Sequence, residues 1–363
     1  MSDLYSSIGK RALFALDAET AHGVSITALR LGLHPRFNAN SDPRLAVSIA
    51  GLEFPNPLGM AAGYDKDGEV PDALLKMGFG HTEVGTVPPL PQPGNPKPRI
   101  FRLPSDQAVI NRLGFNSRGH ANARTNLLAR SGKPGIIGIN IGANKTSEDF
   151  AADYVTGVHQ FADLATYFTV NISSPNTPGL RALQGADPLT DLLQRVGEAR
   201  QQEAEKSGRL VPLFLKIAPD LDDQELDDVT EALSNSDFDA LIVSNTTLSR
   251  AGLTSSNRDE TGGLSGKPLF ERSTVILAKM RLRLSQDFPL IGVGGVHDAE
   301  SAFAKIEAGA SLIQLYSAMV YQGPGLPGTI LQGLQQRCDD DGLSTISQAV
   351  GRSAQDWSKV SLD

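Results

Sequence analysis

Eight short apolar segments recur along this chain, and stretches with the periodicity of amphipathic helices separate them. The segments are LGMAAG (58–63), HTEVGTV (81–87), GIIGINIG (135–142), YFTVNISS (167–174), LFLKIAP (213–219), ALIVSNT (240–246), LIGVGGV (290–296) and SLIQLYSA (311–318). Strands that alternate with helices form a parallel sheet, and eight such units close into a (β/α)8 barrel, the TIM barrel. An open, doubly wound sheet is the alternative, because periodicity alone does not show closure. We therefore expect an α/β protein built on a (β/α)8 barrel.

Length, charge and cysteine content narrow the possible functions. The 363 residues suit one large barrel with additions. The 33 basic and 41 acidic residues give a net charge of −8 without any basic run, which argues against a nucleic-acid partner. A single cysteine, Cys338, excludes an internal disulfide and any cysteine-ligated metal cluster, so we expect no metal. Without a signal peptide or an apolar run of about 18 residues, we expect a protein that is neither secreted nor membrane-spanning.

Residues 1–40 differ from the barrel pattern of residues 41–363. They predict two short amphipathic helices with a break near Asp17, and they carry a net charge of +1 against −9 for the remainder. The apolar positions are Leu4, Ile8, Ala12 and Ala15, then Ala21, Val24, Ala28, Leu29 and Leu31. One interpretation is a helical hairpin packed on its own domain, and the other is a patch that rests on an anionic membrane surface.

A proline-rich insertion at about residues 88–118 interrupts the alternation between the second and third segments. It is too long for a plain barrel connection. We expect it to cover the mouth of the barrel.

Polar residues lie at the carboxyl end of every predicted strand, where the functional residues of such barrels gather. These positions hold Lys66, Thr86, Asn140, Asn171, Ser173, Ser174, Asn176, Thr177, Lys216, Ser244, Asn245, Thr246, Gly294, Gly295, Tyr316 and Ser317. A ligand in the mouth explains the whole set better than eight separate caps do. The glycines and helix starts after the seventh and eighth segments predict a phosphate site, for either a phosphosugar or a cofactor such as FMN.

Two lysines and a group of asparagines suggest what else the ligand carries. Lys216 inside an apolar strand is either a core ion pair or a cation that stabilises negative charge in the mouth. Lys66 is either a surface partner of its neighbouring aspartates or a carboxylate ligand. Asparagine favours turns, but the carboxamides here also fit the donor and acceptor edge of a cyclic ureide; they are Asn111, Asn171, Asn176 and Asn245. No histidine lies at a strand end, and Ser174 is the candidate base.

The same residues occur in motifs that resemble the dihydroorotate dehydrogenase family, in particular its class 2, quinone-dependent branch. The motifs are NPLGMAAGYDKDGEV, EVGTVPPLPQPGNPKPRIFRL, INRLGFNSRG, INIGANK, VNISSPNTPGLR, LKIAPDL, SNTTLSR, TGGLSGKPL, IGVGGV and IQLYSAMVYQGP, between about residues 20 and 330. Class 1 members resemble the barrel but use a cysteine base and lack such an N-terminal extension. A soluble phosphosugar isomerase or lyase and a non-catalytic flavin-binding barrel remain the alternatives from other classes.

The resemblance implies oxidation of (S)-dihydroorotate to orotate in pyrimidine (UMP) biosynthesis, with FMN as hydride acceptor and a membrane quinone as final acceptor. Ser174 matches the base for the C5 proton, and Thr177 and Phe115 match residues that shape the proton path. The matches to substrate contacts are Lys66, Asn111, Gly114, Phe115, Asn171, Asn176, Asn245 and Thr246. The matches to FMN contacts are Ala62, Gly63, Lys66, Thr86, Asn140, Asn171, Lys216, Ser244, Gly266, Gly295, Tyr316 and Ser317.

The resemblance also bears on residues 1–40. His22 and Arg102 match positions that line a quinone tunnel beneath the N-terminal helices. It implies a protein on the cytoplasmic side of the cell membrane, bound peripherally. Two residues depart from the family pattern: Ser244 stands where threonine is common, and Tyr64 where leucine or phenylalanine is common.

Overall fold

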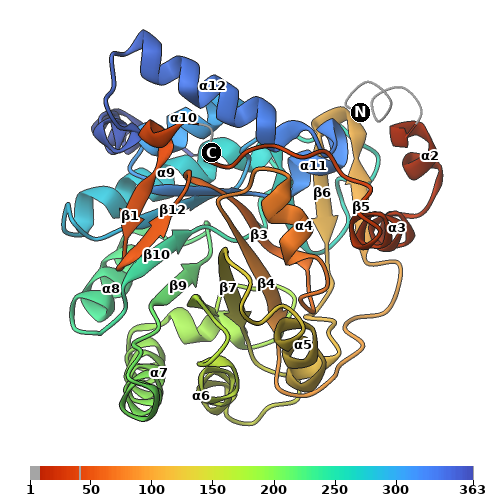
Figure 1. Ribbon diagram of the computed structural model, residues 1–363. Coiled ribbons are helices and arrows are strands. Elements are labelled where there is room, and N and C mark those ends of the chain that lie inside the picture. Colours follow the sequence, from red (N-terminus) through yellow and green to blue (C-terminus); the bar gives the residue numbers. More distant parts are fainter. Residues whose placement is uncertain (1–8, 41, 363) are drawn as a thin grey trace.

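All eight expected segments form strands of one closed parallel barrel in the computed structural model, which describes residues 9–40 and 42–362 (Figure 1). The strands are β3 (Leu58–Asp65), β4 (His81–Val87), β7 (Ile136–Ile141), β8 (Tyr167–Asn171), β9 (Leu213–Ile217), β10 (Ala240–Val243), β12 (Leu290–Val293) and β13 (Leu312–Leu315). Each pairs with the next in chain order, and β13 closes the ring on β3, with Ile313 opposite Leu58. The barrel prediction is confirmed, and the open sheet is excluded.

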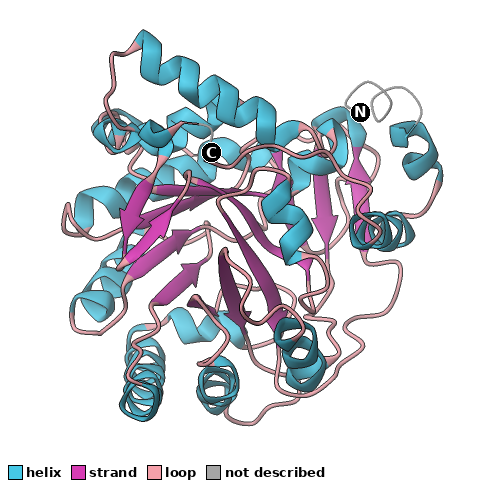
Figure 2. Cartoon of the chain, viewed as in Figure 1, coloured by secondary structure: helices cyan, strands magenta, loops and turns pink. Residues whose placement is uncertain are grey.

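Helices surround the strands (Figure 2). They are α4 (Pro71–Lys76), α5 (Gly119–Leu128), α6 (Phe150–Phe161), α7 (Ala186–Ser207), α8 (Asp223–Ser234), α9 (Phe270–Arg283), α10 (Ala299–Glu307), α11 (Ser317–Gln322), α12 (Leu326–Asp340) and α13 (Ala354–Trp357). Aspartates begin several of them: the side chains of Asp149, Asp222 and Asp298 accept hydrogen bonds from the first-turn amides of α6, α8 and α10. Leucine, isoleucine and valine side chains fill the space between strands and helices. This packing fixes the strand ends that carry the site.

The proline-rich insertion folds into a small antiparallel sheet that the sequence analysis did not anticipate. Its strands are β5 (Ile100–Leu103), β6 (Ala108–Asn111) and β11 (Gly263–Gly266), in the order β11-β6-β5. Because β11 comes from the connection after β10, two segments about 150 residues apart in the chain meet here, with Gly263 opposite Asn111. A second short hairpin, β1 (Val47–Ile49) and β2 (Leu52–Phe54), precedes the barrel.

Two N-terminal helices lie beside β5 at one side of the barrel (Figure 1). They are α2 (Lys10–Ala15) and α3 (Ala18–Arg30), and Asp17 between them accepts hydrogen bonds from the amides of Glu19 and Thr20. The break predicted near Asp17 is confirmed, whereas Leu4 and Ile8 lie outside the described residues. Ion pairing joins α3 to the insertion, because Arg99 donates to both carboxylate oxygens of Glu19, at 2.6 and 3.1 Å.

Candidate active site

One cavity of about 400 Å³ extends from α2 and α3 to the carboxyl ends of the barrel strands. The predicted site residues that line it are His22, Ala62, Gly63, Lys66, Thr86, Arg102, Asn111, Gly114, Phe115, Asn171, Ser174, Asn176, Lys216, Ser244, Asn245, Thr246, Gly266, Gly295, Tyr316 and Ser317. Asn140 does not line the cavity but lies directly behind Thr86, whose hydroxyl donates to its carboxamide oxygen at 2.6 Å. Residues from all eight strand ends are thus brought together.

A hydrogen-bond network connects the strand ends across the floor of the cavity. The Asn171 carboxamide donates to Thr86 Oγ1 at 2.8 Å, and its oxygen accepts from Asn245 Nδ2 at 3.2 Å. Ser173 Oγ donates to the same oxygen at 2.9 Å. Asn245 in turn accepts from the Thr246 amide at 2.7 Å. These bonds orient Asn171 and Asn245, so their carboxamides present fixed donors and acceptors to a ligand.

Glu83 anchors this network from the barrel interior, and the sequence analysis missed it. The carboxylate is fully buried and accepts from Asn140 Nδ2 at 3.1 Å and Gln314 Nε2 at 2.7 Å. Tyr167 and Thr169 hydroxyls donate to it as well, at 3.3 and 3.1 Å. Four donors compensate a buried negative charge. The sequence did hold a signal for it, because a glutamate inside the otherwise apolar strand segment HTEVGTV indicates a buried acidic side chain.

Lys216 is a buried cation that faces the cavity from β9, where it pairs in register with Asn171 of β8. Burial lowers the pKa of its ammonium, and the Glu83 carboxylate acts in the opposite direction. Across the described ranges no carboxylate lies within ion-pair distance of Lys216, which excludes the core ion pair there. A buried cation without such a partner suits an anionic or electron-rich ligand.

Lys66 leaves the end of β3 and turns back toward the cavity, where its ammonium donates to the Gly63 carbonyl at 2.8 Å. Its neighbouring aspartates are engaged elsewhere. Asp65 accepts from the amides of Glu69 and Val70, and Asp67 accepts from Ser117. The surface ion pair considered for Lys66 is therefore not formed. Burial lowers the pKa of the Lys66 ammonium to about 8.

Ser174 lies in the irregular segment after β8, and its side chain is almost fully buried. The Asn176 amide donates to Ser174 Oγ at 3.2 Å. A donated N–H favours negative charge on the oxygen and so promotes loss of the hydroxyl proton. Nearby, the hydroxyl of Thr177 is buried and has no hydrogen-bond partner within the described part of the chain. Both hydroxyls are thus available for a proton transfer.

The small sheet brings the insertion to the site. Asn111 ends β6, and its backbone and side-chain oxygens face Asn176 Nδ2 at 3.2 and 3.5 Å. Gly114 and Phe115 follow with φ angles of 69° and 51°, so a non-glycine residue occupies the left-handed region directly above the cavity. Backbone in this region is strained and is typical of functional sites. Residues of the insertion thus line the cavity.

Glycines after β12 and at the end of β11 allow close approach of the backbone. Gly295 has a φ of 76°, and an added Cβ would lie 2.3 Å from Phe270 Cα. Gly266 has a φ of 98°, and a Cβ there would lie 2.5 Å from a backbone oxygen. On the same side, Ser265 and Ser317 share a hydrogen bond of 2.7 Å. Ser265 lines the cavity and was also missed, because its strand was not predicted.

Aromatic and apolar side chains line the other end of the cavity. His22 on α3 packs edge-on against Tyr64, with ring centroids 5.3 Å apart, and Tyr64 packs against Tyr316 at 5.4 Å. Burial, followed by the charge of Lys66, lowers the pKa of His22 to about 3, so this imidazole is neutral at pH 7. Arg102 on β5 donates to the carbonyls of Leu13, Phe14 and Leu16, which fastens the end of α2 to the insertion. This end is an apolar passage between the N-terminal helices and the barrel.

Fold and site together define an α/β-barrel enzyme whose cavity combines buried cations, oriented carboxamides and an apolar passage. Within the described residues, no group of three or more histidine, cysteine or acidic side chains could hold a metal ion. Comparison of the sequence with known proteins shows the family to which the enzyme belongs. A family model described as dihydroorotate dehydrogenase matches residues 44–338. Curated relatives named dihydroorotate dehydrogenase (quinone), from Brucella anthropi and Brucella melitensis, are 59% identical over 363 residues, covering the whole of both chains.

Comparison with solved structures points to the same family. Dihydroorotate dehydrogenase of Eimeria tenella in complex with ferulenol is 37% identical, with a TM-score of 0.88 over 92% of this chain and 95% of that one. The ligand-free form is 38% identical, with the same TM-score over 93% and 99%. The chain belongs to the dihydroorotate dehydrogenase family, in its quinone-dependent class 2. The resemblance found in the sequence is confirmed.

Proposed function

We propose that this protein oxidises (S)-dihydroorotate to orotate in pyrimidine biosynthesis, with FMN as its cofactor and a membrane quinone as final electron acceptor. The observation that carries the proposal is the composition of the cavity at the strand ends. Lysine and asparagine side chains and Ser174 surround one end, and an apolar passage leads from there to α2 and α3. A phosphosugar enzyme needs no such passage, and a non-catalytic flavin barrel needs no buried serine beside the carboxamides.

FMN fits the part of the cavity below Gly63, Gly266 and Gly295. Lys216 supplies a buried positive charge without a carboxylate partner, which favours electron density on a flavin ring. Gly266 and Gly295 let neighbouring backbone pack closely at the wall of the cavity, and we assign the phosphate to the loops after β12 and β13. Further contacts to the cofactor are assigned to Ala62, Lys66, Thr86, Asn140, Asn171, Ser244, Tyr316 and Ser317. These residues would hold FMN, which would supply a hydride acceptor for C6 of the substrate and an electron donor for the quinone.

Dihydroorotate fits between Lys66 and the carboxamide group. The Lys66 ammonium binds the substrate carboxylate in a charge-assisted hydrogen bond. The ureide ring needs paired donors and acceptors, and the hydrogen-bond network holds Asn171 and Asn245 in place to provide them. Asn111, Asn176, Thr246 and the Gly114–Phe115 backbone complete the enclosure.

Ser174 accepts the proton from C5 while the hydride leaves C6, so the substrate loses one proton and one hydride and gains a double bond. The Asn176 amide stabilises the charge that develops on Ser174 Oγ when its own proton departs. As Ser174 Oγ takes the C5 proton, its own proton leaves past the Thr177 hydroxyl, along a path that Thr177 and Phe115 shape. Burial keeps water away from Ser174, which strengthens this amide contact.

The quinone enters through the apolar passage beneath α2 and α3, with His22 and Arg102 along its path. No helix among residues 9–40 and 42–362 is long and apolar enough to cross a membrane. Several apolar residues on or beside these helices are exposed to solvent. They are Leu16, Val24, Leu31 and Leu33, and each residue is between 38% and 71% exposed. A cluster of this kind supports peripheral binding to the cytoplasmic face of the cell membrane.

Identification of the cofactor tests the proposal. The purified protein should be yellow, and denaturation should release about one FMN per chain without covalent attachment. Recovery of FAD, or of no flavin from fully folded protein, would contradict it.

A further inference from the structure

The segment that carries Ser174, residues 172–179, has no helix or strand of its own. It leaves β8 and ends at the short 3-10 helix η4 (Leu180–Gln184). A base in such a segment needs contacts with rigid neighbours to hold its place. Arg181, in η4, supplies several of these contacts.

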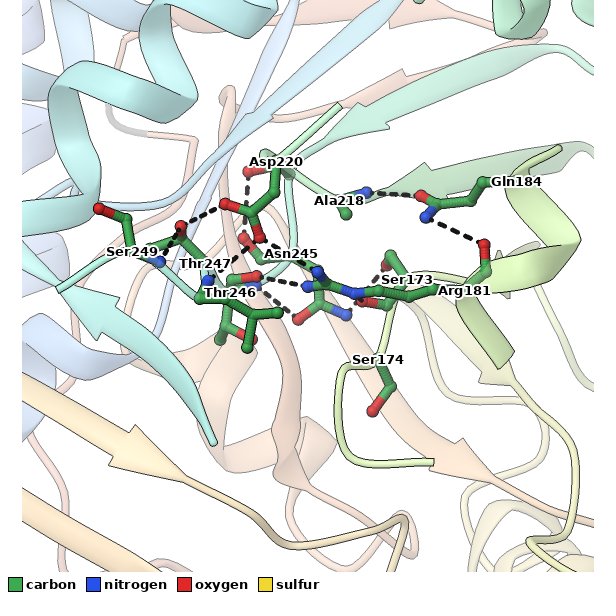
Figure 3. Close-up of polar contacts among 12 residues, drawn as sticks. Ser173, Ser174, Arg181, Gln184, Ala218, Asp220, Asn245, Thr246, Thr247 and Ser249 are labelled. Carbon is green, nitrogen blue, oxygen red and sulfur yellow. Dashed lines mark hydrogen bonds and ion pairs between the residues drawn. The ribbon is translucent and has the colours of Figure 1, made fainter. Parts of the chain in front are cut away.

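The Arg181 guanidinium lies among the loops after three consecutive strands (Figure 3). Its Nε donates to the Ser173 carbonyl at 3.1 Å, one residue from Ser174. One terminal nitrogen donates to Asp220 after β9 at 3.1 Å, and the other to the Thr246 carbonyl after β10 at 3.1 Å. A planar guanidinium with fixed donors therefore sets the position of the Ser174 segment relative to Thr246.

Asp220 fixes the guanidinium in turn. Besides Arg181, its carboxylate accepts from the Thr247 hydroxyl and from the Leu248 amide, the latter at 3.1 Å. It thus joins the loop after β9 to the loop after β10 independently of Arg181. A second link, from the Ala218 amide to the Gln184 side chain at 2.9 Å, ties η4 to the end of β9.

The pair is poorly placed to contribute much to global stability. The Arg181 and Asp220 side chains are 23% and 21% exposed, and partly exposed ion pairs stabilise folded proteins little. The Ser174 hydroxyl points away from the guanidinium, so Arg181 does not act on the proton directly (Figure 3). The main contribution of Arg181 is therefore to hold the Ser174 segment in position.

We propose that Arg181, oriented by Asp220, is a positioning residue for the reaction with dihydroorotate, because it holds the Ser174 segment against the substrate-binding loop at Thr246. The inference rests on the proposed role of Ser174. Electron transfer from reduced flavin to quinone involves neither loop and does not depend on Arg181.

Stopped-flow absorbance on the FMN-containing enzyme separates the two half-reactions. Arg181→Gln should lower the limiting rate of flavin reduction by dihydroorotate between about 10-fold and 100-fold, while quinone reoxidation and flavin content stay within twofold of wild type. Asp220→Asn should show a smaller loss. Arg181→Lys should recover only part of the rate, because one ammonium cannot reach all three acceptors. Arg195→Gln is the matched control, since that arginine pairs with Asp149 on the outer surface.

Hydrogen exchange of residues 172–184 gives a readout that is independent of the chemistry. It should quicken along the whole segment in Arg181→Gln, whereas in Ser174→Ala only the Asn176 amide, which loses its acceptor, should exchange faster. Equal slowing of both half-reactions, restoration of the full rate by Arg181→Lys, or unchanged reduction in Arg181→Gln would each overturn the proposal. If Arg181→Gln loses flavin, the test passes to Asp220→Asn. Slower flavin reduction with unchanged quinone reoxidation in that variant supports the proposal, and equal slowing of both steps overturns it. Failure of the base assignment is distinct, because it would appear as unchanged reduction in Ser174→Ala.

Discussion

At the residue scale, the surroundings of Ser174 explain how an ordinary hydroxyl can serve as a base. Burial alone raises the cost of removing its proton, but the amide of Asn176 donates to Ser174 Oγ and offsets that cost. The hydroxyl of Thr177, three residues further on, has no hydrogen-bond partner among the described residues and can take part in the proton transfer. Ser174→Ala should keep FMN bound but slow flavin reduction by dihydroorotate between about 10²-fold and 10⁴-fold. Reoxidation by quinone should stay near normal because it involves no C5 proton. Stopped-flow absorbance measures both steps, and reduction at the wild-type rate would remove Ser174 from the mechanism.

Lys66 gives the site a pH dependence whose sign follows from its pKa of about 8. Below that pH the ammonium is charged and binds the orotate carboxylate; above it the free enzyme loses this proton. Orotate should therefore bind about tenfold more weakly per pH unit above 8, until the complex itself titrates. Flavin absorbance titrations between pH 7 and 10 measure this slope.

Lys66→Ala should cost orotate about 1.5–3 kcal/mol of binding free energy and abolish the pH slope. Lys133→Ala, which removes an exposed lysine paired with Asp72, is the matched control. An unchanged affinity in Lys66→Ala would contradict the carboxylate assignment.

Most of the polar residues that line the cavity could be predicted one by one, because polar side chains at strand ends stand out in a parallel barrel. Glu83 could not be placed, since its role depends on donors from three other strands. The roles of Arg181 and Asp220 could not be predicted either, because their hydrogen bonds join loops that are brought together only in the folded barrel.

At the element scale, the N-terminal helices should govern access of quinone and leave the flavin chemistry intact. Deleting residues 1–33 removes α2 and α3 but keeps Phe37, which packs beside Gly78 and Gly328. Flavin reduction and turnover with a small soluble acceptor should persist, whereas turnover with a long-tailed quinone should fall sharply. A purely structural hairpin predicts equal losses with all acceptors, together with lost flavin. Undiminished turnover with the long-tailed quinone would rule out the entrance role.

Leu31 offers a point test of membrane binding, since 71% of it is exposed beside α3. Leu31→Asp should reduce co-sedimentation with anionic liposomes while activity in detergent stays near wild type. Leu210→Asp, at an exposed leucine before β9, is the control and should sediment normally. Equal sedimentation of the two variants would contradict docking through the helices.

Barrel strands were predictable because each is a short apolar run between helices. Strand β11 was not, because GLSG has little intrinsic strand preference and pairs with a segment about 150 residues away. Strands β5 and β6 were not predicted either, because each is only four residues long and lies within the proline-rich insertion. The β1–β2 hairpin was not predicted either, because its turn holds Ala50 and Gly51 and not an Asn-Gly or Asp-Gly pair. Ala50 and Gly51 both have positive φ, at 50° and 72°, as a two-residue hairpin turn requires.

At the scale of the whole molecule, the barrel, the insertion and the helices share one cavity. Ligand that binds only the folded state stabilises it by mass action, about 2.7 kcal/mol at a hundredfold excess over Kd. Removal of FMN should therefore lower the Tm, and the Tm should rise again with added FMN. Differential scanning calorimetry of the flavin-free protein measures this, and a Tm independent of FMN would show that the folded protein does not bind the cofactor.

The central claim is that one cavity links dihydroorotate oxidation to quinone reduction through a bound flavin. Its most direct test is an anaerobic titration of the purified protein followed at the flavin absorbance. Dihydroorotate should bleach the flavin fully with formation of one orotate per flavin, and a long-tailed quinone should then restore the colour. Flavin that stays oxidised with dihydroorotate, or reduced flavin that the quinone does not reoxidise, would contradict the account.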